Sequence, residues 1–144
     1  MAFIHPCFIR KNTPELRRKL EELGYIPPSR IWYDENFAIG TIHRNNVGEY
    51  IVFKIDDDFE RVIAPSYPYI DCGTNEDLFL ALAALRDDKP DYQWFLWEHN
   101  DGEYHPEEND SWRQYIPGEH WEEWWWFEIR KATAEELIEY FNKE

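Results

Sequence analysis

The sequence predicts a single α+β domain in which a largely antiparallel sheet packs against three helices. Apolar residues recur with helical spacing in three segments, at about 13–23, 75–87 and 133–142. Runs rich in aromatic and β-branched residues, bounded by turn residues, lie between these segments and are typical of strands. The chain has 144 residues, the usual size of one domain, and 43% of them are hydrophobic, which is enough for a core.

Each predicted helix begins with a threonine that can cap its N-terminus. Thr13 precedes Pro14, a residue suited to the first helical position, and Gly24 supplies a stop for this helix. Thr74 is the predicted cap of the second helix, and Thr133 that of the third. The second helix is the richest in Leu and Ala, so we expect it to be the buried one.

The strands are predicted from period-two patterns and turn residues. Two of them, 37–44 and 50–55, flank Asn45-Asn46-Val47-Gly48, which favours a hairpin. Pro65 and Pro68 restrict the short extended pieces around them to edge positions. The remaining strands are expected at 2–10, 61–64, 67–71, 93–99, 103–105, 112–116 and 124–130.

Three segments, 8–15, 69–76 and 128–135, align without gaps. Each reads as the apolar end of a strand, a short turn, Thr-x-Glu and then a helix. The pattern indicates either an internal strand–helix repeat or the independent recurrence of a common capping motif.

Two of the helical segments carry a resemblance. CGTNEDLFLALAALRDD, followed by an aromatic strand, and KATAEELIEYF resemble segments of small proteins encoded in prophages and mobile elements of gut bacteria (Bacteroidales). The resemblance covers roughly half the chain and implies a genomic setting. That family has no assigned activity, so the resemblance assigns no functional residue.

The charge is strongly acidic and uneven. The net charge is −15, from 30 acidic and 15 basic residues. Residues 98–123 carry nine acids and one base, a net charge of −8, whereas residues 1–33 carry six bases and three acids. Such acidity disfavours direct binding to nucleic acid or to an anionic membrane, and it favours a basic protein partner. No signal peptide or membrane-spanning run is recognised, so the expected location is cytoplasmic.

Few residues suggest catalysis. Cys72 lies two residues before the predicted cap Thr74, where a helix N-terminus can lower a thiol pKa, although a buried, inert cysteine has the same local pattern. His99, His105 and His120 lie among carboxylates but match no metal-ligand spacing. We therefore assign no catalytic, cofactor-binding or metal-binding residue, and we expect no cofactor.

Seven of the eight tryptophans lie between Trp94 and Trp126, within the same acidic region. Consecutive rings in a strand point to opposite faces, so part of this set is exposed unless the strand is buried on both sides. The candidate partner surface consists of Trp112, Trp121, Glu122, Glu123, Trp124, Trp125 and Trp126.

These observations favour a non-catalytic binding protein, an accessory factor of a phage or mobile element that engages a basic protein partner. A more specific form is a DNA mimic or an inhibitor of a toxin or nuclease. Two other classes stay open: a small hydrolase or metal-dependent enzyme that uses Cys72 and the histidines, and a carbohydrate-binding module.

Overall fold

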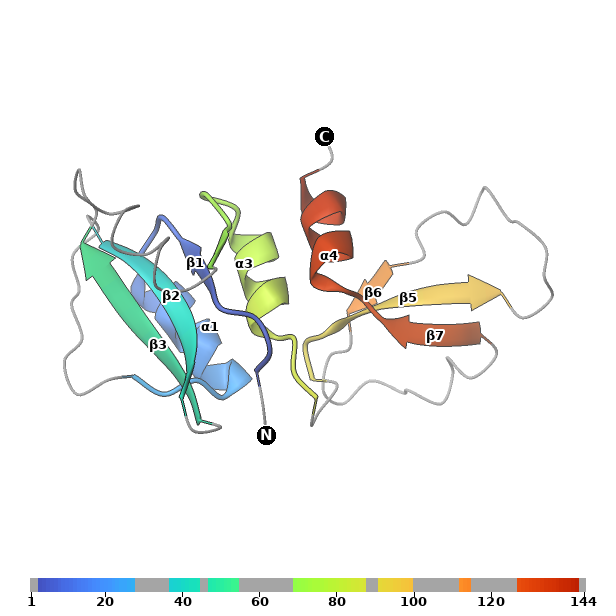
Figure 1. The fold of residues 1–144 in the computed structure, drawn as a ribbon, viewed down its shortest axis with the longest axis horizontal. Coiled ribbons are helices and arrows are strands. Elements are labelled where there is room, and N and C mark those ends of the chain that lie inside the picture. Colours follow the sequence, from blue (N-terminus) through green and yellow to red (C-terminus); the bar gives the residue numbers. More distant parts are fainter. Residues whose placement is uncertain are drawn as a thin grey trace.

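A computed structural model of the chain describes residues 3–27, 37–44, 47–54, 69–87, 91–99, 112–114 and 127–142. It confirms the α+β class (Figure 1). No helix among these residues is long and apolar enough to cross a membrane. The described helices are α1 (Pro14–Leu23), α3 (Glu76–Ala83) and α4 (Ala134–Phe141).

The first sheet has four strands in the order β3-β2-β1-β4. Its strands are β1 (Cys7–Ile9), β2 (Phe37–Arg44), β3 (Val47–Lys54) and β4 (Ile70–Asp71). The pair β2–β3 is the predicted hairpin, with Arg44 opposite Val47 and Phe37 opposite Lys54. β1 runs antiparallel to β2 and parallel to β4, so the sheet is mixed.

The second sheet has three antiparallel strands in the order β6-β5-β7. They are β5 (Trp94–His99), β6 (Trp112–Gln114) and β7 (Phe127–Lys131). The expectation of one largely antiparallel sheet is thus refined: the described strands divide between two sheets, and one of their pairs is parallel.

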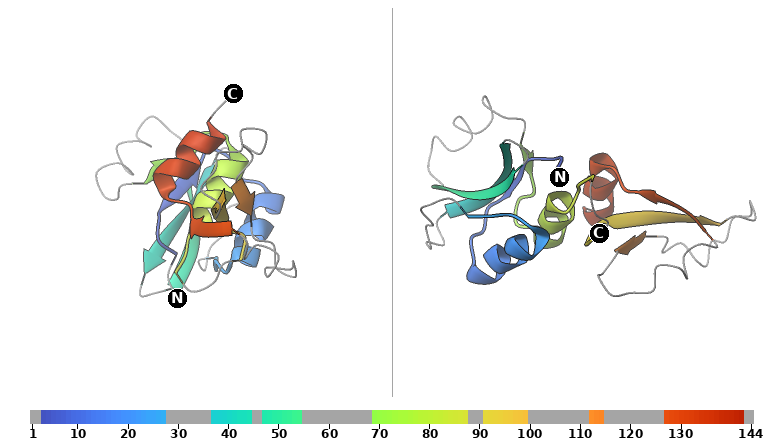
Figure 2. Two further views of the ribbon diagram at one scale, coloured as in Figure 1. Left: turned by 90° about the vertical axis from the view of Figure 1, so that its right-hand side faces the viewer. Right: turned by 90° about the horizontal axis from the view of Figure 1, so that it is seen from below.

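The helix α3 lies at the centre of the molecule. It packs against β1 and α1 on one side and against α4 on the other (Figures 1 and 2). The α4 helix in turn lies beside the second sheet. Phe79 and Leu82 of α3 are fully buried, and one hydrophobic cluster joins them to Ile9, Leu20 and Leu137 from the surrounding elements. The prediction that the Leu- and Ala-rich helix is the buried one is confirmed.

The caps of α1 and α4 are those predicted. The Thr13 hydroxyl accepts a hydrogen bond from the Leu16 N–H at 3.1 Å, and α1 ends at Gly24, whose φ of 106° suits glycine. In α4, Thr133 and Glu136 form a reciprocal capping box. Local sequence chemistry therefore sets both ends of α1 and the start of α4.

The predicted cap of the central helix was wrong by one residue. Asn75, not Thr74, accepts the hydrogen bond from the Leu78 N–H, at 3.1 Å. The cause is the strand before it: the Gly73 carbonyl still accepts a hydrogen bond from the Arg10 N–H, so the parallel pairing continues past β4. Gly73 then turns the chain at a φ of 60°, and the helix begins one residue later than the pattern indicates.

The helix α3 ends earlier than predicted, and the strand β1 begins later than predicted. The helix ends at Ala83 because the next residues pair with the N-terminal segment: the Ile4 N–H donates to the Leu85 carbonyl, and Phe3 forms an isolated bridge with Arg86. Residues 3–4 therefore pair with this segment, and β1 starts only after Pro6, which has no N–H to donate.

The other strand predictions agree with the structure where it describes them. β2 has the predicted bounds, and β3, β5, β6 and β7 overlap their predicted segments. The predicted strands at 61–64 and 103–105, and the parts 67–68, 115–116 and 124–126 of other strands, lie outside the described residues.

The corrected cap gives a direct test. Asn75→Ala should lower the free energy of unfolding by about 1 kcal/mol or more, because the side chain caps α3 and its amide also donates to the Phe141 carbonyl at 3.0 Å. Thr74→Ala should cost less, because Thr74 is exposed and is not the cap. Denaturant unfolding of both variants measures these losses of free energy. An equal or larger loss for Thr74→Ala would contradict the assignment of Asn75 as the cap.

The central helix offers a matched pair of leucines. Leu82 is fully buried and Leu80 is only partly buried. We expect Leu82→Ala to cost about 2–5 kcal/mol and Leu80→Ala clearly less. Comparable denaturation midpoints for the two variants would show that α3 is not the core helix.

Candidate functional site

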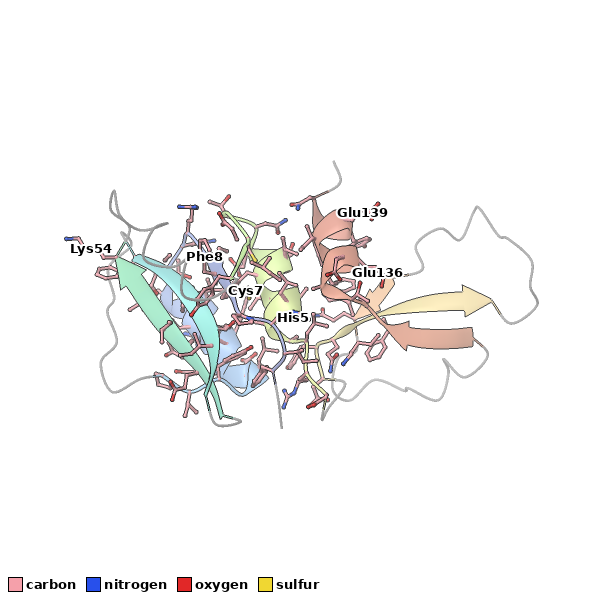
Figure 3. All side chains as sticks on the ribbon, in the orientation of Figure 1. His5, Cys7, Phe8, Lys54, Glu136 and Glu139 are labelled. Atoms are coloured by element: carbon pink, nitrogen blue, oxygen red, sulfur yellow. The ribbon has the colours of Figure 1, made fainter. Side chains whose placement is uncertain are left out.

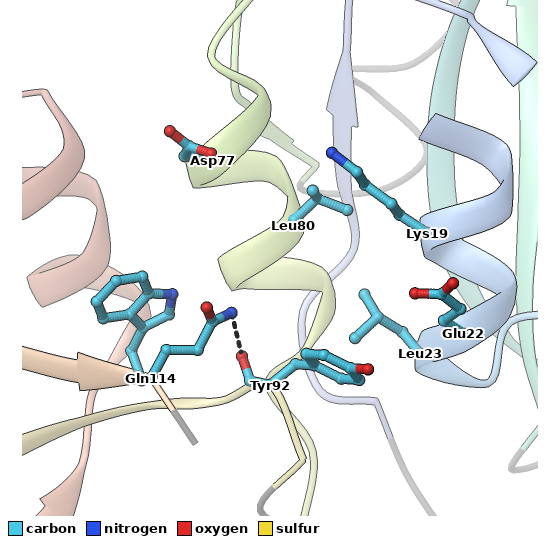
Figure 4. Close-up of a pocket in the computed structure, with 8 residues that line it drawn as sticks. Lys19, Glu22, Leu23, Asp77, Leu80, Tyr92 and Gln114 are labelled. Carbon is cyan, nitrogen blue, oxygen red and sulfur yellow. Dashed lines mark hydrogen bonds between the residues drawn. The ribbon is translucent and has the colours of Figure 1, made fainter. Parts of the chain in front are cut away.

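A pocket opens where α1, α3 and the start of β5 meet (Figure 4). Its volume is about 240 Å³. We call it the interhelix pocket. It is lined by Lys19, Glu22, Leu23, Asp77, Leu80, Tyr92, Trp94 and Gln114.

Two aromatic rings and two leucines form the apolar part of the lining. Trp94 is half-buried, and its ring meets those of Phe141 and Tyr140 from α4 at centroid distances of 5.2 Å and 5.8 Å. Leu23 is the last residue of α1, and Leu80 comes from α3. The helix α4 thus fixes the orientation of the Trp94 ring from outside the pocket.

Tyr92 enters the lining through an unusual backbone conformation. Its φ is 64°, the only positive φ at a non-glycine residue in the described parts of the chain. A bulky residue adopts this conformation at a cost, and such residues concentrate at functional sites. The Gln114 side-chain amide donates to the Tyr92 carbonyl at 3.1 Å, which holds this turn against β6.

The charged residues of the pocket are not balanced. Lys19 donates to Glu76 at 2.8 Å, and Lys11 donates to the other oxygen of Glu76 at 3.0 Å. Within the described part of the chain, neither Glu22 nor Asp77 forms an ion pair. Two carboxylates therefore face a pocket in which the one ammonium group of the described lining residues already has a carboxylate partner.

This network shifts two pKa values in opposite directions. Hydrogen bonds from Lys19 and then Lys11 lower the pKa of Glu76. The hydrogen bond to Glu76 raises the pKa of Lys19, and the nearby charges of Asp77 and Glu22 add to this effect. Lys19 and Glu76 are therefore both charged at neutral pH.

Most of the candidate partner surface predicted from the sequence falls outside the described residues. These positions are Trp121, Glu122, Glu123, Trp124, Trp125 and Trp126. Trp112 is described as the first residue of β6, paired with Leu96. The strands that precede and follow residues 121–126 in the sequence, β6 and β7, lie on either side of β5 in the second sheet. Trp94, at the start of the same Trp-rich region, is the member placed in the pocket.

The thiols do not have the environment of nucleophiles. Cys7 and Cys72 are both free and buried. Cys7 is the first residue of β1 (Figure 3), and its sulfur lies 3.8 Å from the Phe79 carbonyl of α3. Hydrogen bonding to Cys7, followed by burial, raises the pKa of the Cys72 thiol. Of the two possibilities that the local sequence left open for Cys72, the structure supports the buried, inert cysteine: its sulfur contacts the Ile70 carbonyl at 3.9 Å inside the core.

The described residues hold no group of three or more His, Cys, Asp or Glu side chains that could bind a metal ion. His105 and His120 lie outside the described residues, and the structure describes only the backbone of His99, in β5.

The interhelix pocket could not be predicted from the sequence, because no local pattern connects its parts. Glu22 and Asp77 are far apart in the sequence and come from different helices, and Tyr92 precedes a strand by two residues. The one available signal was the pair Tyr92 and Trp94, two aromatic residues at strand spacing beside a helix end.

No protein-family model, curated protein or solved structure matches the chain.

The Glu76 network predicts a pH effect on stability. A carboxyl group whose pKa is lowered by folding stabilises the fold above its unfolded pKa, and this contribution is lost as the pH falls through the folded pKa. Between about pH 7 and about pH 3, the wild type should lose more stability than Glu76→Gln. Thermal melts across this range give the comparison. Glu139→Gln, at an exposed position of α4, is the control and should follow the wild type. Parallel curves for all three proteins would refute the effect.

Proposed function

We propose that the protein is a non-catalytic binding protein that engages a basic protein partner, as an accessory factor of a phage or mobile element. The contact surface combines the Trp- and acid-rich segment 94–126 with the interhelix pocket at its start. One observation carries the proposal: Trp94, the first tryptophan of that segment, lines a pocket whose carboxylates Glu22 and Asp77 have no ion-pair partner among the described residues.

The charge distribution supports the same partner. Residues 98–123 have a net charge of −8. Complementary charge accelerates the encounter of two proteins, and screening by salt weakens this attraction beyond about 8 Å at physiological ionic strength. Aromatic side chains then supply the desolvated contacts that determine affinity. An acidic surface rich in tryptophan provides both contributions.

An inhibitor of a basic toxin or nuclease is the more specific form of this proposal. Such a protein could mimic DNA if its carboxylates were spaced like phosphates. Competition between the protein and duplex DNA for the recovered partner tests this form directly, because a DNA mimic and DNA would exclude one another.

Carbohydrate binding is the second candidate. Trp94 and Tyr92 provide two rings in one pocket, and Gln114 supplies an amide beside them. Sugar-dependent quenching of tryptophan fluorescence that is lost in Trp94→Phe would favour this candidate over the basic partner.

The main prediction is that binding to the partner weakens with salt and depends on the tryptophans. A partner recovered from the host would be purified, and its affinity measured against salt concentration. Alanine variants of the tryptophans that anchor the partner should lose about 2 kcal/mol or more of binding free energy. The variants to compare are Trp121→Ala, Trp124→Ala, Trp125→Ala and Trp126→Ala.

Each variant must first give the cooperative unfolding transition of the wild type, because a buried tryptophan would affect binding through loss of folding. If affinity is independent of salt and every folded variant binds like the wild type, this segment is not the contact surface. The basic N-terminal residues Arg10, Lys11, Arg17 and Arg18 would then be tested next.

A further inference from the structure

We propose that the interhelix pocket binds the cationic end of one lysine or arginine side chain presented by a basic protein partner. This inference rests on the proposed function, and it specifies the chemical group that the partner inserts. Four properties of the pocket carry it: size, charge, aromatic lining and rigidity.

The size of the pocket suits one side chain. Its volume of about 240 Å³ lies below the roughly 300–1,000 Å³ of sites for drug-sized ligands. A nucleotide or a bulky cofactor would therefore not fit inside. An extended lysine or arginine side chain, which is narrow and has an apolar stem, suits a pocket of this volume.

The charge of the pocket selects for a cation. Glu22 comes from the last turns of α1, and Asp77 from the first turn of α3. Among the described residues of the lining, the only positive group is Lys19, whose ammonium is held by Glu76 at 2.8 Å, and Lys11 binds the same carboxylate. Anions such as phosphates or carboxylates would meet two negative groups there. A ligand cation would instead gain attraction from both.

The apolar lining complements the rest of a basic side chain. Trp94 and Tyr92 present rings, and a cation near the face of such a ring gains a favourable electrostatic interaction. Leu23 and Leu80 provide aliphatic surface for the methylene stem, which lysine and arginine bury while the charged end reaches polar groups. The pocket combines carboxylates, aromatic rings and aliphatic surface. This combination suits a lysine or arginine side chain better than a simple inorganic ion.

The rings are already positioned. Phe141 contacts the Trp94 ring edge-on at 5.2 Å, and Gln114 fixes the Tyr92 carbonyl at 3.1 Å. The positive φ at Tyr92 places this residue in the lining, and the free-energy cost of this conformation is already included in the stability of the folded protein. A site that is ordered before binding loses little conformational entropy when the ligand enters.

The experiment uses small probes and no protein partner. The full-length ¹⁵N-labelled protein is titrated at low salt with N-acetyl-lysine methylamide and with N-acetyl-arginine methylamide. Their uncharged isosteres, the norleucine and citrulline derivatives, serve as matched ligands. The readout is the indole N–H signal of Trp94, assigned by its absence from the spectrum of Trp94→Phe. Both charged probes should shift this signal to saturation, and the isosteres should bind about tenfold more weakly or not at all.

Variants separate the pocket from the general acidity of the chain. Glu22→Gln and Asp77→Asn should each weaken the charged probes about threefold or more, because each removes one attractive charge. Glu139→Gln makes the same change of charge on the exposed side of α4 and should leave the affinity unchanged (Figure 3). Leu80→Phe should fill the pocket and abolish binding in a protein that still unfolds cooperatively.

Four outcomes would overturn the inference: no binding of the charged probes, equal binding of the isosteres, equal weakening by Glu139→Gln, or saturation by methyl glucoside in place of the charged probes. The last outcome would assign the pocket to a carbohydrate. The relative affinity of the two charged probes shows whether the ammonium or the guanidinium group is preferred. Because no partner is present, the titrations test the pocket alone, whereas the salt dependence of partner binding and its loss in the tryptophan variants of segment 121–126 test the proposed function through a different part of the contact surface.

Discussion

The fold depends on one buried guanidinium group. Arg86 is 5% exposed, and its Nη1 donates to the Leu23 carbonyl at 2.8 Å, at the end of α1. The same group lies over the Phe3 ring at 4.8 Å, which anchors the N-terminal segment. The Arg86 carbonyl accepts hydrogen bonds from Gln93 at 3.0 Å and from Lys131 at 2.8 Å, both from the second sheet or its entry. A charge is stable at this depth only when hydrogen bonds compensate its lost hydration, so the bond to the Leu23 carbonyl must form as the guanidinium group is buried, whereas the bonds from Gln93 and Lys131 involve the Arg86 backbone. One residue therefore joins the end of α1, the N-terminal segment and the second sheet.

The interhelix pocket lies over the junction that Arg86 holds. Leu23, on one side of the pocket, is the residue whose carbonyl accepts the hydrogen bond from the Arg86 guanidinium group. The opposite part, Tyr92 and Trp94, flanks Gln93, whose side chain binds the Arg86 carbonyl. Trp94 is held a second time because its carbonyl accepts a hydrogen bond from the Ala132 N–H at 3.0 Å. The separation of the two sides is thus set by buried hydrogen bonds, while the charged groups lie at the surface above them. A pocket built in this way keeps its shape when surface charges are changed, which makes charge substitutions there informative.

Features that depend on a few neighbouring residues could be predicted from the sequence, and features that depend on distant pairing could not. The Thr13 and Thr133 caps and the hairpin of β2 and β3 follow from local backbone chemistry, and each was predicted at its place. The cap at Asn75 was missed because the hydrogen bond between Arg10 and Gly73 joins segments more than 60 residues apart and delays the helix. The same reason explains the early end of α3, where residues 85–86 pair with the N-terminal segment. The pocket is non-local in the same sense, since its carboxylates come from two helices and its rings from a strand entry. Composition indicated an acidic, Trp-rich protein, but only the tertiary contacts bring Trp94 near Glu22 and Asp77.

The pKa shifts of Cys72, Tyr25, Glu76 and His5 favour a fixed charge state for each of these groups over proton transfer. A general acid or base works best when its pKa lies near the working pH. Here the hydrogen bond with Cys7, followed by burial, raises the pKa of Cys72, burial raises that of Tyr25, and the hydrogen bond from Lys19 lowers that of Glu76. Burial also lowers the pKa of His5 from 6.5, which favours its neutral form. Each of these shifts moves a group further from neutrality and fixes its charge state. In the pocket, the same effect keeps Glu76 ionised and Lys19 paired with it, so that Glu22 and Asp77 have no direct ion pair among the described residues. A charge pattern that stays constant around neutral pH can recognise a cation steadily, and such constancy is of more use to a binding surface than to a site that must exchange protons in each cycle.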